Sequence, residues 1–154
     1  MTTIRVGLVD VYVFRGAAER LQLLLLRRAH GPRAGSWEAV HGHIEPEEHP
    51  VATARRELAE ETGCHAEALF NLSAVEQFYL HADDTVMLIP VFAARVAPDA
   101  VVILGREHDQ CRWVPPDEAR RWYTWPRAVR AVDAIERLLH SGDAGVVDGV
   151  LRVR

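Results

Sequence analysis

The sequence predicts a mixed α+β fold in which one β-sheet is covered by helices on both faces. Three observations support this: several short apolar segments with strand composition, one helix with clear ends, and a long amphipathic segment near the C-terminus. The segments do not follow a repeated β-α-β-α order, and there is no G-x-G-x-x-G or Walker loop. A doubly wound nucleotide fold is therefore not expected, and the 154 residues fit a single domain over 1–154.

The expected elements come from composition, periodicity and turn signals. Short apolar runs rich in β-branched and aromatic residues predict strands over 4–14, 21–26, 37–45 (interrupted near Gly42), 74–81, 85–96, 101–104 and 111–114. Helical spacing predicts helices over 50–62, 115–122 and 125–140. The tail 145–154 carries Asp148-Gly149 between apolar pairs, which predicts a hairpin.

The helix over 50–62 has the clearest ends. Pro50 suits a first helical position and Gly63 suits a C-terminal cap. At helical spacing, Val51, Ala54 and Leu58 share one direction and are expected to face the sheet.

Composition and charge exclude several classes of protein. A net charge of -4 gives no basic face for nucleic acid, and no apolar run is long enough to span a membrane. The two cysteines are too few for a disulfide framework, and the N-terminus lacks the layout of a signal peptide. These features predict a cytoplasmic protein. The apolar tail is compatible with a homodimer.

The helix over 50–62 also gathers carboxylates at its unfavourable end. Glu57, Glu60 and Glu61 fall within an arc of about 100° near the C-terminus, where partial negative charge favours cations. Arg56 lies four residues before Glu60 and can hold that carboxylate. A solvated acidic surface is one explanation. The alternative is a divalent cation, because convergent carboxylates without matching cations suit Mg²⁺.

The stretch that contains these glutamates resembles the signature of the Nudix hydrolases, G-x5-E-x7-R-E-U-x-E-E-x-G-U, where U is a bulky aliphatic residue. The matching residues over 42–64 are Gly42, Glu48, Arg56, Glu57, Leu58, Glu60, Glu61 and Gly63. Cys64 stands in the last aliphatic position and can serve there as a small hydrophobe. The surrounding sequence looks most like the bacterial dATP or dihydroneopterin triphosphate pyrophosphohydrolases.

The resemblance implies a three-layer α-β-α sandwich with a mixed sheet. It also implies Mg²⁺-dependent attack of water on phosphorus in a nucleoside triphosphate or a related nucleoside diphosphate compound, with Mn²⁺ as a substitute. The implied metal ligands are Glu57, Glu60, Glu61 and the carbonyl of His41, and the implied catalytic residues are Glu57, Glu60, Arg56 and Glu107. Gly42, Glu48 and Gly63 would be structural.

Further residues are candidates for contact with a substrate. Arg27 and Arg28 end a strand near the predicted site, and guanidinium groups match phosphate geometry. Trp37 and Trp125 could stack on a base, and His43 lies two residues after His41. A nucleotide sugar or a dinucleoside polyphosphate remains an alternative substrate. A nucleotide-binding domain without catalysis is a further alternative. The choice between Glu57 and Glu107 as the base stays open.

Overall fold

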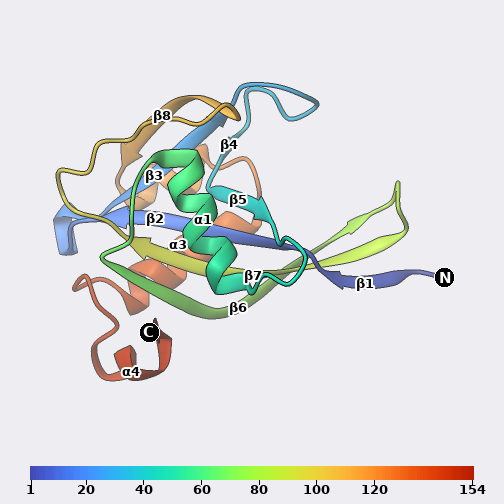
Figure 1. The fold of residues 1–154 in the computed structure, drawn as a ribbon. Helices are drawn as coiled ribbons and strands as arrows, with labels where there is room; N and C mark the ends of the chain where they lie inside the picture. The colour runs from blue at the N-terminus through green and yellow to red at the C-terminus, as the bar shows by residue number, and fades with distance from the viewer.

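The computed structural model describes all 154 residues and places one mixed β-sheet between helices on its two faces (Figure 1). The predicted three-layer arrangement is confirmed. In chain order the strands are β1 (Thr3–Val6), β2 (Leu8–Arg15), β3 (Gln22–Arg28), β4 (Trp37–Glu38), β5 (Val40–His43), β6 (Ala68–Leu80), β7 (Thr85–Arg95), β8 (His108–Val114) and β9 (Arg152–Val153). The helices are α1 (Pro50–Thr62), α2 (Pro116–Trp122), α3 (Arg127–Leu138) and α4 (Asp148–Leu151).

The sheet divides at β5. Its main order is β4-β3-β2-β7-β6-β9, with β1 paired to β7, β8 to β3 and β5 to β2. The first half of β2 pairs with β5 through residues 8–11, whereas β2 meets β3 only through residues 14–15. The strand β5 therefore lies where β2 and β3 separate, and the candidate site forms around it.

Two apolar cores lie on opposite faces of the sheet. Successive side chains of β2 alternate between them, as the pleat of a strand requires. Tyr12 and Phe14 belong to the core that includes α3, and Val9, Val11 and Val13 belong to the core that includes α1. All residues from 8 to 14 are buried, which is typical of a strand with both faces covered.

The helix α1 has the predicted bounds. Pro50 is in its first turn, and Gly63 ends it in the left-handed conformation with φ 68°, donating its N–H to the carbonyl of Ala59 at 2.9 Å. Ala54 and Leu58 are buried against the sheet, as predicted. None of the helices combines the length and the apolar character needed to cross a membrane.

The prediction of a strand over 101–104 is wrong. This segment has no strand partner, and its backbone instead covers the end of α1. Ile103 donates its N–H to the carbonyl of Thr62 at 2.8 Å, and Gly105 donates to the carbonyl of Glu61 at 3.1 Å. The last carbonyls of a helix lack partners within the helix, so this extended segment satisfies them instead of joining the sheet.

Other boundaries also differ from the predictions. The predicted hairpin in the tail is wrong, because Asp148 begins the short helix α4 and only residues 152–153 pair with β6. The strand predicted over 4–14 is two strands, since its pairing with β7 shifts by one residue around Gly7. The strand β6 begins at Ala68 rather than at residue 74, and a bulge after Asn71 interrupts its register.

Candidate active site

Arg56 lies at the centre of a charged cluster at the edge of α1. Its Nε and Nη2 donate to the two oxygens of Glu48, both at 2.9 Å, and Nη2 also donates to the carbonyl of His43 at 2.9 Å. Its Nη1 donates to Glu57 at 2.7 Å and to Glu60 at 3.2 Å. The hydrogen bonds from Arg56 lower the pKa of Glu48 to about 2. One guanidinium thus ties the loop before α1 to the helix and fixes the carboxylate of Glu57.

Glu61 is a buried carboxylate without a hydrogen-bond partner. It is 4% exposed, and neither of its side-chain oxygens has a partner in the structure. The nearest cationic candidate is the Nδ1 of His108 at 3.8 Å, which is too long for a hydrogen bond. Burial, reinforced by the charges of Glu107 and Glu57, raises the pKa of Glu61 to about 9. Such a group is costly unless something further binds it.

A polar chain runs from the interior beside Glu61 to the surface. The Nε2 of His108 lies 3.2 Å from Glu38, whose carboxylate also accepts from Arg28 at 3.2 Å. Arg28 in turn donates to Glu107 at 2.8 Å. Burial alone would raise the pKa of Glu38, but the hydrogen bond from His108 and the charges of Arg33 and Arg28 lower it below its usual value.

Gly42 allows α1 to approach β5 closely. A Cβ at this position would lie 2.0 Å from the Cδ of Glu57 and 2.3 Å from its Oε1. Only glycine therefore permits the carboxylate of Glu57 to take its place beside the strand. Because side chains alternate along a strand, His41 and His43 project to the opposite face of β5 from Gly42.

Two cavities adjoin at β5. The first has a volume of about 170 Å³ and no hydrophobic lining residue; it is lined by Arg28, Arg33, His41, Gly42, His43, Glu45, Arg56, Glu57 and Glu107. The second has about 490 Å³ and is mostly apolar; it is lined by Leu8, Arg33, His41, His43, Phe78, Tyr79, Leu80, Met87, Trp125 and Arg127. We call them the charged cavity and the apolar cavity. Both are lined by Arg33, His41 and His43, so they meet at these residues.

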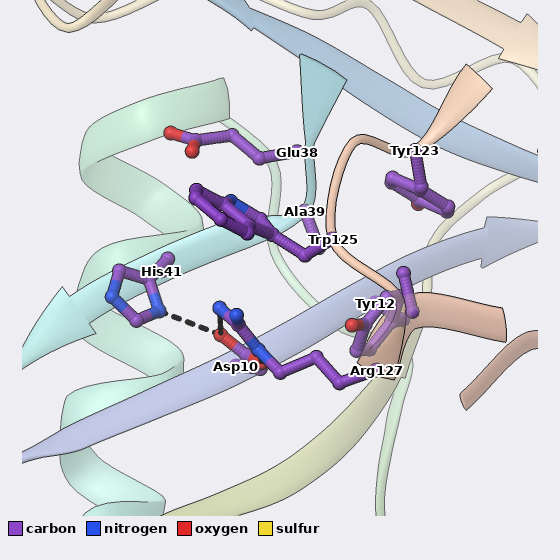
Figure 2. Close-up of a pocket in the computed structure, with 9 residues that line it drawn as sticks. Asp10, Tyr12, Glu38, Ala39, His41, Tyr123, Trp125 and Arg127 are labelled. Carbon is purple, nitrogen blue, oxygen red and sulfur yellow. Dashed lines mark hydrogen bonds and ion pairs between the residues drawn. The ribbon is translucent and has the colours of Figure 1, made fainter. Parts of the chain in front are cut away.

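A buried network holds His41 at this junction, as Figure 2 shows. The Nδ1 of His41 lies 2.6 Å from Asp10 Oδ1, and Arg127 Nε donates to Asp10 Oδ2 at 2.8 Å. Asp10 is 2% exposed. Burial alone would raise its pKa, but the hydrogen bonds and charges of His41 and Arg127 lower it. The carboxylate is therefore ionised and holds both partners in place.

The structure brings some predicted contact residues into the charged cavity and not others. Arg28, His43 and Glu107 line it, together with the signature residues Gly42, Arg56 and Glu57. Arg27 is paired with Asp109 instead, at 2.7 Å. Trp37 is 8% exposed and packs edge-on against Trp122, so it belongs to the core and lines neither cavity.

Several residues of the site carry no motif in the sequence. Asp10 had one visible signal, since it is a lone carboxylate in the otherwise apolar run LVDVYVF. Its partner Arg127 is 117 residues away, and no local pattern connects them. Glu38 and His108 are 70 residues apart and meet only because β4 and β8 flank the same strand, β3.

The predicted metal ligands do not form a ready-made coordination group. No three or more His, Cys, Asp or Glu side chains are placed to share an ion. Arg56 engages Glu57 and Glu60, and Glu60 is 58% exposed. The unpartnered oxygens of Glu61 are what a cation would satisfy. Carboxylate oxygens suit a hard divalent ion such as Mg²⁺ or Mn²⁺, so the chemistry of these residues fits one.

Comparisons of the sequence agree with the signature. The NUDIX domain model matches residues 2–135. The asymmetrical bis(5'-nucleosyl)-tetraphosphatase of Rattus norvegicus is 33% identical over 101 residues, covering 64% of this chain and 67% of that protein. The octanoyltransferase of Myxococcus xanthus is 36% identical over 113 residues, covering 69% of this chain. The matched region is only 30% of that protein, so its name indicates nothing about the chemistry of this chain.

Comparisons of the structure agree on the fold. A C. elegans Ap4A hydrolase superimposes with a TM-score of 0.72 at 21% identity, covering 86% of this chain and 96% of that chain. A MutT protein from Methanosarcina mazei superimposes with a TM-score of 0.65 at 26% identity, covering 88% of this chain and 93% of that chain. The match to the hydrolase establishes a shared architecture, at an identity that says nothing about substrate.

Proposed function

This chain belongs to the Nudix family and is a pyrophosphohydrolase that acts on acid anhydrides, and we propose that its substrate is a dinucleoside polyphosphate. The observation that carries this proposal is the pair of adjoining cavities at β5. Three arginines lie around the charged cavity, which suits a polyphosphate chain. The larger apolar cavity beside it suits a nucleoside. The similarity to the rat tetraphosphatase supports two nucleosides rather than one.

The arginines are suited to bind and orient phosphate groups. Arg28 and Arg33 line the charged cavity, and each uses only Nη1 for carboxylates: Arg28 donates to Glu38 at 3.2 Å and to Glu107 at 2.8 Å, and Arg33 donates to Glu38 at 3.5 Å. The Nε and Nη2 groups of both arginines are left for a ligand. Guanidinium groups can bind phosphate oxygens in pairs. Arg56 is committed to three carboxylates and is therefore better suited to positioning Glu57 than to binding substrate.

A divalent ion, which we propose to be Mg²⁺, would be held by Glu61 together with Glu57 and Glu60, and when bound it supplies charge neutralisation on the phosphoryl oxygens. Of these residues, Glu61 has the clearest need for a cation, because both its oxygens are buried without a partner. The backbone carbonyl of His41 is a further proposed ligand.

Glu57 is our preferred proton acceptor from the attacking water, over Glu107. Burial raises the pKa of Glu57, although Arg56 opposes the effect, so it is a stronger base than an ordinary carboxylate. Its Oε1 is held by Arg56 at 2.7 Å, which fixes the group beside the charged cavity. Glu107 is 54% exposed and its carboxylate is already paired with Arg28 at 2.8 Å, so it faces solvent and is engaged by a cation.

Gly42→Ala tests the placement of Glu57. The added methyl group must displace the carboxylate of Glu57, because it would lie 2.0 Å from its Cδ. We expect kcat to fall by about 100-fold, since small misplacements of a reacting group have effects of this size. The fold should survive, because the end of a side chain can move aside. Steady-state kinetics and circular dichroism check both parts.

Gly149→Ala is the matched control for this substitution. A Cβ there meets nothing within 4 Å, so the variant should behave as the wild type. A Gly42→Ala enzyme with wild-type kcat would show that Glu57 is not held where the chemistry occurs.

A nucleoside triphosphate is the second candidate substrate. One apolar cavity adjoins the charged one, and a single cavity accommodates a substrate with one nucleoside or one pteridine. This reading corresponds to the dATP or dihydroneopterin triphosphate branch. A nucleotide sugar would need polar groups at the place where a dinucleoside polyphosphate puts its second nucleoside.

A substrate panel distinguishes these candidates by their products. With Mg²⁺, diadenosine tetraphosphate should be hydrolysed to ATP and AMP, with kcat/KM at least about tenfold above that for ATP, dATP, dihydroneopterin triphosphate or a nucleotide sugar. Hydrolysis in ¹⁸O-labelled water shows which phosphorus is attacked. A preference for dATP or dihydroneopterin triphosphate, with release of pyrophosphate, would replace our proposal with the second candidate.

The variant Glu61→Gln, purified in parallel, controls for contaminating hydrolases. Nucleotide binding without hydrolysis of any member of the panel would favour a non-catalytic nucleotide-binding domain instead.

A further inference from the structure

His41 lies where the charged cavity and the apolar cavity meet. It lines the charged cavity, the apolar cavity and a third space of about 10 Å³ beside Asp10. In any nucleotide the ribose joins the base to the phosphate. A nucleotide with its phosphates in the charged cavity and its base in the apolar cavity would therefore place its ribose beside His41.

The contact between Nδ1 and Asp10 sets the orientation of the imidazole ring of His41. An ionised carboxylate only accepts hydrogen bonds, so the 2.6 Å contact means that Nδ1 of His41 carries a hydrogen and donates it to Asp10. Arg127 donates to both oxygens of the same carboxylate, at 2.8 and 3.5 Å, and so restricts its rotation. The other ring nitrogen, Nε2, lies on the side of the ring away from Asp10 (Figure 2). It has no protein partner and is free for a ligand.

The chemistry of Nε2 selects a hydroxyl group. A neutral imidazole with a hydrogen on Nδ1 accepts at Nε2, whereas a protonated one donates there. A hydroxyl group can form a hydrogen bond with either form of the ring, because it is both donor and acceptor. A phosphate oxygen without a proton only accepts, so it can form a hydrogen bond only with the protonated ring.

We propose that Nε2 of His41 binds a ribose hydroxyl of the substrate, and that Asp10 and Arg127 are positioning residues that act through His41. The proposal rests on the proposed function, since it takes the substrate to be a nucleotide. It identifies His41 as a residue that distinguishes ribonucleotides from deoxyribonucleotides.

The test uses binding of AMP, 2'-deoxyAMP and 3'-deoxyAMP, measured by calorimetry, so that it requires no turnover. The wild type should bind AMP about 5- to 30-fold more tightly than one of the two deoxy forms, which is the value of one good hydrogen bond. The affected form identifies the hydroxyl. AMP binding without any loss for either deoxy form would overturn the inference and leave the proposed function standing. Absence of binding by all three would count against both.

Two substitutions of His41 separate ligand contact from structural support. In His41→Gln the side-chain amide reaches about as far as Nε2, and in His41→Asn it reaches only as far as Nδ1. We expect the Gln variant to keep much of the preference for AMP over the affected deoxy form, and the Asn variant to bind both about equally. A purely structural role predicts the reverse, because only Asn matches the position that contacts Asp10. Equal discrimination by the wild type and the Asn variant would overturn the inference.

Asp10→Asn tests the positioning role. The amide can still accept from His41 but has lost the charge that holds the ring and Arg127. The affinity for AMP should fall toward that of the affected deoxy form, while the affinity for that deoxy form stays near its wild-type value. A parallel fall of all three affinities would indicate general damage to the cleft and contradict positioning through His41. The two His41 variants keep the test decisive if this buried substitution prevents folding.

Discussion

Glu61→Gln is expected to reduce hydrolysis by at least about 100-fold and, at the same time, to stabilise the metal-free protein. Residues that merely support metal ligands contribute 10- to 100-fold, and we expect a ligand itself to matter at least as much. The carboxyl group of Glu61 is 4% exposed with no partner for either oxygen, so burial keeps it protonated in the metal-free protein, and a neutral amide of the same shape avoids the cost of holding that proton at neutral pH.

The stabilisation should depend on pH in a defined direction. The pKa of Glu61 is about 9 in the folded metal-free protein and about 4.5 in the unfolded chain. Between these values the unfolded chain has released a proton that the folded protein keeps. The free energy of unfolding therefore falls as pH rises from about 4.5 to 9, by up to about 1.4 kcal/mol per pH unit from this group. Below pH 4.5 the group has no effect.

Denaturant unfolding in a chelator, at several values between pH 5 and pH 8, measures this difference. The advantage of Glu61→Gln over the wild type should grow with pH. Mg²⁺ should raise the Tm of the wild type by mass action and raise that of the variant much less. Glu19→Gln, at an exposed position, is the control and should follow the wild type. If the difference in free energy of unfolding between Glu61→Gln and the wild type is the same at every pH from 5 to 8, Glu61 is not the carboxylate that we assign to a cation.

Arg56→Ala is expected to impair both stability and hydrolysis. The guanidinium donates to three carboxylates and one carbonyl, and without it Glu48, Glu57 and Glu60 face one another with no cation among them. We expect the Tm to fall by roughly 5–10 °C. We also expect kcat to fall by about 100-fold, because Glu57 loses the bond that fixes it. Differential scanning calorimetry and steady-state kinetics measure the two effects.

The neighbouring residues provide matched comparisons. Arg55 is exposed on the same helix, so Arg55→Ala changes charge and helix composition by the same amount and should alter neither property strongly. Arg56→Lys keeps the charge but cannot reproduce a forked set of donors, and it should fall between the wild type and alanine. A lysine variant equal to the wild type would show that charge alone matters. An alanine variant with normal kcat would rule out the positioning role.

Local features of the sequence were sufficient for much of the fold. Pro50, Gly63 and the apolar spacing of Ala54 and Leu58 define α1, because end signals and periodicity act within one helix. The contact of Arg56 with Glu60 was also predictable, since residues four apart on a helix are neighbours. The predictions failed where partners were distant. The segment 101–104 has strand composition, but the carbonyls at the end of α1 take its hydrogen bonds.

The sequence by itself therefore determined the family, the signature helix and its cluster of carboxylates, because these depend on residue types at fixed local spacing. Only the tertiary structure decided what each carboxylate meets. It left Glu61 buried without a partner, paired Glu57 with Arg56, and joined Asp10 to Arg127 across 117 residues. It also formed the two cavities that meet at His41. Burial, ion pairing and cavity shape depend on which strands and helices pack together, and local sequence patterns do not contain that information.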